Sequence, residues 1–245
     1  MNKIRDNRID FLRGFAMIAM IVTHTTAYFP SDKVANTIWN WSNFAVPIFI
    51  FCSVYLFFSK HIEKPIHFFS YVKKRSLRLL IPYYVFLLVF IPMVYFITPD
   101  KVTFTYIFNS VFVIGGVDIN WLVLLFLYIT IIPPAIVYFW HKQKALFWGF
   151  FTLSLASSIY LLFGTLPFAY KWIMWLPWSV ILYFTFFSLF LAKQKHLTRN
   201  MIIFLSILFI GSIASRLFTD QSLVLTHNKY PPNMFYLSYG IKCMH

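Results

Sequence analysis

The sequence predicts an all-α integral membrane protein, a polytopic helical bundle. Three observations predict it: an apolar composition, long uncharged runs, and basic residues confined to the gaps between those runs. Of 245 residues, 60% are hydrophobic and 11% are charged, whereas a soluble domain is nearer half apolar and about a quarter charged. A soluble fold of this length has too little interior to hide so much apolar surface. We therefore expect most of the chain to lie in lipid.

The apolar runs have the length of membrane-crossing helices. A helix needs about 20 residues to cross the hydrocarbon core, and the runs are too continuous for the alternating strands of a barrel. The sequence predicts one membrane-embedded domain over residues 1–245, with seven spans and the start of an eighth. The seven spans are about 11–29, 38–58, 77–97, 121–140, 146–163, 172–191 and 201–218, and the eighth begins near 232.

A shorter apolar run, at about 104–113, cannot cross the membrane by itself. We expect it to lie at the interface or to re-enter the bilayer.

The basic residues favour an N-terminus in the cytoplasm. With that orientation, lysines and arginines in the predicted inner segments outnumber those in the outer segments by about three to one. This bias accounts for the net charge of +14, so we expect no nucleic-acid partner. The predicted location is the plasma or inner membrane, with membrane lipids as the surrounding partners.

Cysteine and histidine spacing predicts neither a disulfide framework nor a metal site. Cys52 and Cys243 are far apart, and no cluster has the spacing of metal ligands.

The first predicted span carries the strongest functional signal. Eleven residues separate Arg13 from His24, which is three helical turns plus about 20°, so both side chains lie on one side about 16 Å apart. Asp10 precedes Arg13 by three residues and can pair with it. Ionisable groups within a membrane helix are costly and by default functional. A histidine there can act as a general base near neutral pH. The alternative is that Asp10 and Arg13 form an interfacial salt bridge that sets orientation, while His24 only packs.

These residues resemble the opening of acyltransferase family three, whose integral-membrane members include sugar and polysaccharide O-acetyltransferases. The family's arginine, acidic residue, Leu-Arg-small sequence and deeper histidine are matched by Arg8, Asp10, Leu12-Arg13-Gly14 and His24. Further stretches resemble the family in order along the chain. They are residues 46–53, 71–83, 120–122 with Tyr128 and Pro133, and 229–233. Val54 departs from the pattern, since the family usually has Gly there. The chain also stops as its eighth predicted span begins, so we expect the domain to be incomplete at its C-terminus.

The resemblance implies transfer of an acyl group, commonly acetyl from acetyl-CoA or another acyl-CoA, to a hydroxyl. The acceptor would be a cell-surface glycan or its lipid-linked precursor. The resemblance makes His24 the catalytic residue, as general base or as a transient covalent carrier of the acyl group.

Arg13, Arg75 and Arg78, at the predicted cytoplasmic face, would then hold the phosphates of the donor. For Arg75 and Arg78 the alternative is contact with lipid headgroups. Supporting and cavity-lining roles fall to further residues. The acyl-CoA-binding or supporting set is Arg13, Asp10, Arg8, Arg75 and Arg78, and the cavity-lining set is Ser53 and Trp121. A different class of function, a transporter or flippase for a glycan or lipid, would use Asp10, Arg13 and His24 as a substrate or proton pathway.

Overall fold

The computed structural model describes residues 7–63, 67–164, 170–191 and 195–243. Within them the fold is helical throughout, apart from one isolated bridge between Lys229 and Pro232. The helices are α1 Asn7–Thr26, α2 Lys33–Trp41, α3 Ala45–His61, α4 Phe68–Ile97, α5 Phe104–Val111, α6 Asn120–Lys142, α7 Lys144–Tyr160, α8 Tyr170–Ile173, α9 Trp175–Leu191, α10 Lys195–Phe218 and α11 Met234–Lys242. Short 3₁₀ turns lie at Pro99–Lys101 and Leu225–Asn228.

Four segments within the described residues are long and apolar enough to cross a bilayer. They are Lys33–His61, Phe68–Ile97, Asn120–Lys142 and Tyr170–Phe190. Helix α10 contributes a shorter apolar stretch, Ile203–Phe218, and α7 has 17 residues. The predicted fold class is therefore confirmed as helical with membrane-spanning segments, whereas the count of seven and the start of an eighth is not established by these four.

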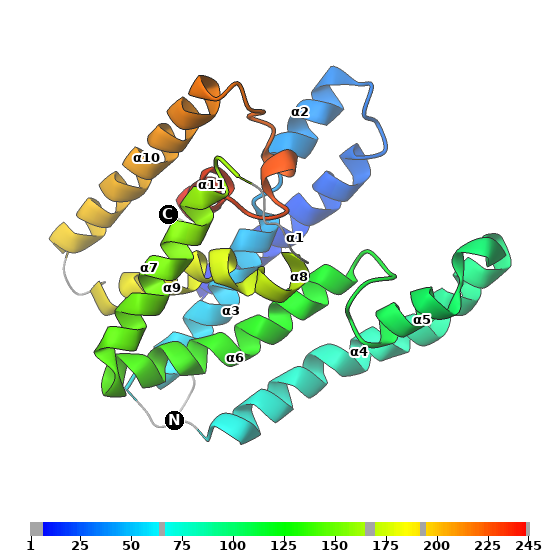
Figure 1. Cartoon of the computed structure of the whole chain (residues 1–245), viewed down its shortest axis with the longest axis horizontal. Coiled ribbons are helices and arrows are strands. Elements are labelled where there is room, and N and C mark those ends of the chain that lie inside the picture. The colour runs from blue at the N-terminus through cyan, green and yellow to red at the C-terminus, as the bar shows by residue number, and fades with distance from the viewer. Residues whose placement is uncertain (1–6, 64–66, 165–169, 192–194, 244–245) are drawn as a thin grey trace.

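Helix α3 lies at the centre of the bundle and contacts α1, α6, α9 and α11 (Figure 1). Along Ala45–Phe58 its side chains are apolar on nearly all faces, as expected of a helix surrounded by other helices. Ile48, Ile50, Cys52 and Phe58 are fully buried. The second predicted span, 38–58, is in fact divided between α2 and α3.

Helix α4 is peripheral and leans against α6 and α5 (Figure 1). Of its 30 residues, Tyr83 and Leu87 are buried. Large apolar side chains such as Leu88 and Phe96 point outward, with exposed fractions of 77% and 85%. Such an apolar surface is stable when it faces lipid.

Helix α11 approaches α3 closely, and a glycine permits it. A Cβ built on Gly240 would lie 2.6 Å from both Cβ and Cγ of Pro47. Small residues let membrane helices pack at such short distances. This contact holds the C-terminal part of α11 against the start of α3.

Candidate functional site

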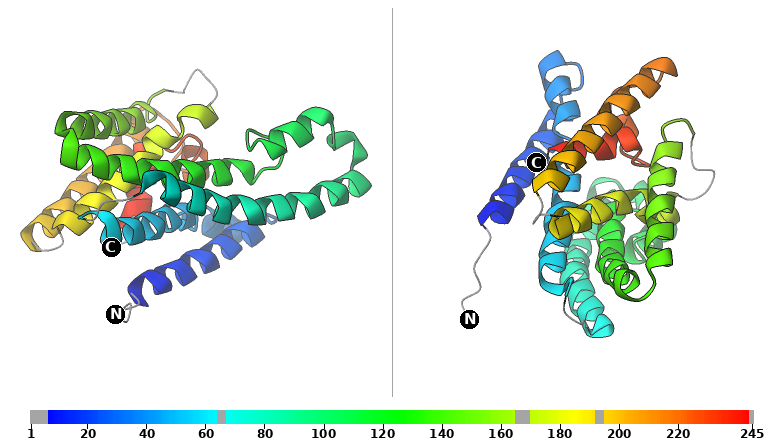
Figure 2. Two further views of the ribbon diagram at one scale, coloured as in Figure 1. Left: turned by 90° about the horizontal axis from the view of Figure 1, so that it is seen from below. Right: turned by 90° about the vertical axis from the view of Figure 1, so that its left-hand side faces the viewer.

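Helix α1 lies along one side of the bundle, where it packs against α2 and α3 (Figure 2). Its buried residues are Ile9, Ala16, Ala19 and Thr23. Alanines on this face allow close approach to α3. The Thr23 hydroxyl donates to the Ala19 carbonyl at 2.7 Å and lies 2.9 Å from the Ser42 hydroxyl. These contacts fix the rotation of α1 about its axis.

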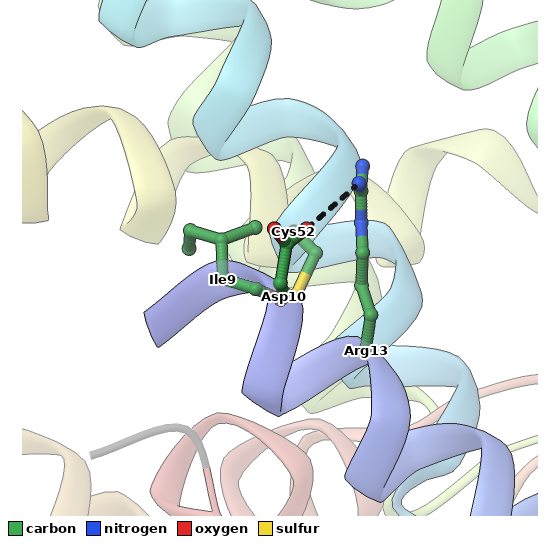
Figure 3. A network of polar contacts seen from close by, with 4 residues as sticks. All are labelled: Ile9, Asp10, Arg13 and Cys52. Carbon is green, nitrogen blue, oxygen red and sulfur yellow. Dashed lines mark hydrogen bonds and ion pairs between the residues drawn. The ribbon is translucent and has the colours of Figure 1, made fainter. Parts of the chain in front are cut away.

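The ionisable side chains of α1 lie off this buried face. The carboxylate of Asp10 is 3.9 Å from the guanidinium of Arg13, and both side chains are partly exposed (Figure 3). Arg8 is exposed. The thiol of Cys52, on α3, faces the Ile9 carbonyl at 4.0 Å, so α3 passes directly beside this pair. His24 is exposed near the other end of α1.

A cavity of about 310 Å³ lies at the end of α1 that carries His24. This size is at the lower end of the range for ligand pockets, about 300–1,000 Å³. We call it the His24 cavity. Its walls come from α1, the turn between α2 and α3, the start of α6 and the loop before α11. Its lining residues include Met20, Thr23, His24, Ser42, Asn43, Asp118, Trp121, Lys229 and Tyr230.

Lys229 brings a positive charge into the His24 cavity. Its ammonium group donates to Asn43 Oδ1 at 3.3 Å and lies 5.5 Å and 5.0 Å from the ring centroids of Trp121 and Tyr230. The two rings meet edge to face at 4.5 Å. Burial disfavours the charged form and lowers the pKa of Lys229 to about 8.

A network of asparagines holds the Lys229 loop in place. Asn40 accepts a hydrogen bond from the Leu225 backbone at 2.6 Å, and Asn233 donates to Asn228 at 2.5 Å. Asn233 also caps α11 by accepting from the Tyr236 backbone at 3.2 Å. The Tyr236 hydroxyl donates to the Asn43 carbonyl at 2.8 Å. The loop is thus tied both to α2 and to the residue that contacts Lys229.

The opposite wall is fixed by buried Asn120 at the start of α6. Its side chain accepts from the Tyr83 hydroxyl and donates to the Gly115 carbonyl. Lys171 donates to the neighbouring Ile114 carbonyl at 2.8 Å. These contacts position the loop that carries Asp118 and the adjacent Trp121.

A second cavity, of about 440 Å³, lies where Arg13 faces the end of α3 and the start of α4. We call it the Arg13 cavity. Its lining is strongly basic, with five lysine or arginine side chains. Its charged and polar lining residues are Arg13, Ser53, Lys60, His61, Tyr71, Lys74, Arg75 and Arg78. Such a cluster attracts anions and favours phosphate-bearing ligands.

Arg75 is the most constrained of these cations. One guanidinium nitrogen donates to the Tyr71 hydroxyl at 2.6 Å, and another donates to Ser53 Oγ. The guanidinium carbon also lies 5.8 Å from the Tyr71 ring centroid. Fixed in this way, Arg75 loses less conformational entropy when it binds a ligand.

Comparison with known proteins decides the family. The profile of acyltransferase family three, described as an acyltransferase domain, matches residues 6–244. The chain belongs to acyltransferase family three. Comparison with curated proteins gave no significant match, and comparison with solved structures gave none either.

Membership of acyltransferase family three assigns the chain to the membrane acyltransferases as a class. The residues predicted as its site fall into two groups. Arg13, Ser53, Arg75 and Arg78 line one cavity, whereas His24 and Trp121 line the other. Asp10 and Arg8 line neither cavity. Arg13 and His24 therefore lie in two separate cavities, and the intervening α1 side chains of Met17 and Ile21 are exposed.

Several lining residues of this family member were not predicted as site residues, although the family-like stretches 71–83 and 229–233 include three of them. Lys229, Tyr230 and Asp118 join His24, and Tyr71 joins Arg75. The sequence signal for Lys229 was its place before Tyr230 and two prolines, directly ahead of an apolar run. Among the described residues, no group of histidine, cysteine and carboxylate side chains is arranged to hold a metal ion.

Proposed function

We propose that the chain is a membrane O-acyltransferase. It transfers an acyl group, acetyl from acetyl-CoA, to a hydroxyl of a cell-surface glycan or its lipid-linked precursor. One observation carries the proposal: α1 presents Arg13 to a basic cavity and His24 to a second cavity about three turns away, whose lining mixes polar, aromatic and charged side chains. A phosphate-rich donor and a hydroxyl acceptor each have a matching site on one helix.

The orientation follows from which segments share each cavity. The His24 cavity is built from the end of α1 and the starts of α3, α6 and α11, whereas the Arg13 cavity is built from the start of α1, the end of α3 and the start of α4. If α1, α7 and α10 cross the membrane as well as the four long segments, the helix ends that line one cavity all lie on the same side of the membrane. Lysine and arginine gather at the Arg13 cavity, which favours the cytoplasm for that end and for the N-terminus.

The donor would bind through its phosphates in the Arg13 cavity. Guanidinium groups hold phosphate oxygens through paired hydrogen bonds, and Arg75 is already held in place by Ser53 and Tyr71. Asp10 supports Arg13 from the same helix at 3.9 Å. The thioester arm of the donor must then extend along α1 toward His24, about 16 Å farther on.

At the His24 cavity the reaction is an acyl substitution. The acceptor hydroxyl gives its proton to the imidazole of His24, and its oxygen forms a bond with the thioester carbonyl carbon. The carbon–sulfur bond breaks, and the departing sulfur takes the proton back from the imidazolium. General base catalysis of this kind contributes about 10²–10⁴-fold.

The test uses membranes from cells that express the protein, supplied with radiolabelled acetyl-CoA. We expect label to enter an alkali-labile ester, and His24→Ala to lower its rate by about 10²–10⁴-fold. His227→Ala is the matched control, because His227 is also exposed and lies near the same end, but outside the cavity lining. Equal labelling by the His24→Ala and parent proteins would refute the proposal. Label on the chain itself that acid and hydroxylamine both release rapidly, and that is absent from His24→Ala, would replace the base role by a covalent acyl-imidazole.

A further inference from the structure

The unusual group in the His24 cavity is the ammonium of Lys229. Among the described residues it forms no ion pair, since no carboxylate lies within 4 Å of it. Its nearest partners are an amide oxygen and two aromatic rings. A half-buried cation without an acidic partner is costly to keep in a fold. The cost is offset when a ligand supplies the negative charge.

Asp118 does not supply that charge. It lines the same cavity but is exposed to solvent, and among the described residues it forms no ion pair with Lys229. The only hydrogen bond that the structure shows from Lys229 Nζ is the one to Asn43, so this group retains donors for a ligand. Because Lys229 lines the cavity, a ligand bound there can accept from these donors.

The charge balance of the cavity selects the kind of anion. Lys229 brings one positive charge and Asp118 one negative charge. A doubly charged phosphate monoester would meet a single cation and a carboxylate, which is unfavourable. A singly charged carboxylate can pair with Lys229 and adds half as much negative charge as the phosphate. The aromatic rings of Trp121 and Tyr230 offer a wall against which a sugar ring can pack.

We propose that the His24 cavity binds an acidic sugar, with Lys229 pairing with the sugar's carboxylate and Trp121 and Tyr230 packing against its ring. Lys229 is thereby a specificity-determining residue for the acceptor. The inference rests on the proposed function only for the statement that this sugar is the acyl acceptor. Binding itself requires no acyl transfer.

The experiment compares two probes that differ in charge, methyl β-glucuronide and methyl β-glucoside, binding to the full chain purified in detergent. We expect the parent protein to bind the glucuronide about tenfold more tightly, as a hydrogen bond to a charged group allows. Lys229→Met and Lys229→Gln should remove this preference, and Lys229→Arg should retain most of it. The Gln variant removes the charge but keeps a polar hydrogen-bond donor in the side chain. Lys33→Met, which changes an exposed lysine outside the cavity, is the control.

Each outcome decides the inference. Equal affinity of the parent for both probes, binding of neither, or a preference that persists in both uncharged variants overturns it. A preference that depends on Lys229 supports it even if the labelling assay fails, in which case only the proposed function is lost. Labelling that depends on His24 without a charge preference leaves the proposed function and removes this inference.

Discussion

Arg75 on α4 donates a hydrogen bond to Ser53 on α3, and this contact joins the two helices across the basic cavity. Arg75 is thereby aimed at the space that Arg13 and Arg78 also face. A serine in an apolar helix usually bonds to its own backbone. Here the hydroxyl instead accepts from a neighbouring helix, and it thereby positions Arg75 in the basic cavity that we propose as the donor site.

Ser53→Ala is therefore expected to raise the KM for acetyl-CoA severalfold with a smaller effect on kcat. The guanidinium of Arg75 remains but is held only through Tyr71. Steady-state kinetics of CoA release measure both constants. Ser59→Ala is the matched control, because the Ser59 hydroxyl donates to the Leu56 carbonyl of its own helix at 3.2 Å. A similar change in both variants would argue against the positioning role.

Arg13→Gln is expected to raise the KM for acetyl-CoA about tenfold, since a charge-assisted contact to phosphate is lost. Lys142→Gln removes a positive charge from an exposed position outside the cavity and should leave the KM unchanged. If the two variants behave alike, Arg13 acts only through the general charge of that face.

Lys229 makes the stability of the fold depend on pH. Burial lowers its pKa from 10.5 to about 8 in the folded state, so the folded chain releases this proton before the unfolded chain does. Between about pH 8 and 10.5 the unfolded state binds more protons, and stability gains a rising contribution from this residue. Below pH 8 the full cost of the buried charge is present.

The measurement is the difference in thermal midpoint between the parent and Lys229→Met, because other groups titrate alike in both. His24, Asp118 and Tyr230 face the same cavity and are retained in both proteins. The advantage of the methionine variant should shrink as the pH rises from 8 to 10.5. A difference that stays constant across this range would show that the charge of Lys229 costs the fold nothing.

Gly240 offers a test of the packing between α11 and α3. Gly240→Ala places a methyl group 2.6 Å from the ring of Pro47, which cannot rotate away. Overpacking of this kind costs about 1–3 kcal/mol, so the thermal midpoint in detergent should fall. Gly149→Ala on α7 is the control, because a Cβ there meets no atom within 4 Å. An unchanged midpoint for Gly240→Ala would mean that α11 can shift without loss.

The helices were predictable because a run of apolar residues in lipid has little choice but to form one. The residues at which the helices begin and end were harder to predict. The span expected at 38–58 divides after Trp41, where neither proline nor glycine occurs. The side chains of Ser42 and Asn43 bond back to the Ile38 and Trp39 carbonyls, both at 2.7 Å, and turn the chain. Such local bonds have no distinctive sequence pattern.

The candidate site was predictable only where it follows helical spacing. The interval from Arg13 to His24 places both on one side of α1. Which cavity each side chain enters depends on α3, α4 and α6, and spacing within one helix carries no information on that. Lys229 joins His24 in the lining of one cavity only through the folding of the loop before α11, so its placement became visible in three dimensions.

The central claim is that the donor enters at the Arg13 cavity and that His24 acts at the opposite end of α1. The most direct measurement follows CoA release from acetyl-CoA added outside sealed vesicles of known orientation. Inside-out vesicles, which expose the cytoplasmic face, should release CoA in a manner that depends on His24. Sealed right-side-out vesicles should be inactive until permeabilised. Equal rates in the two sealed preparations, or full activity of His24→Ala, would contradict the account.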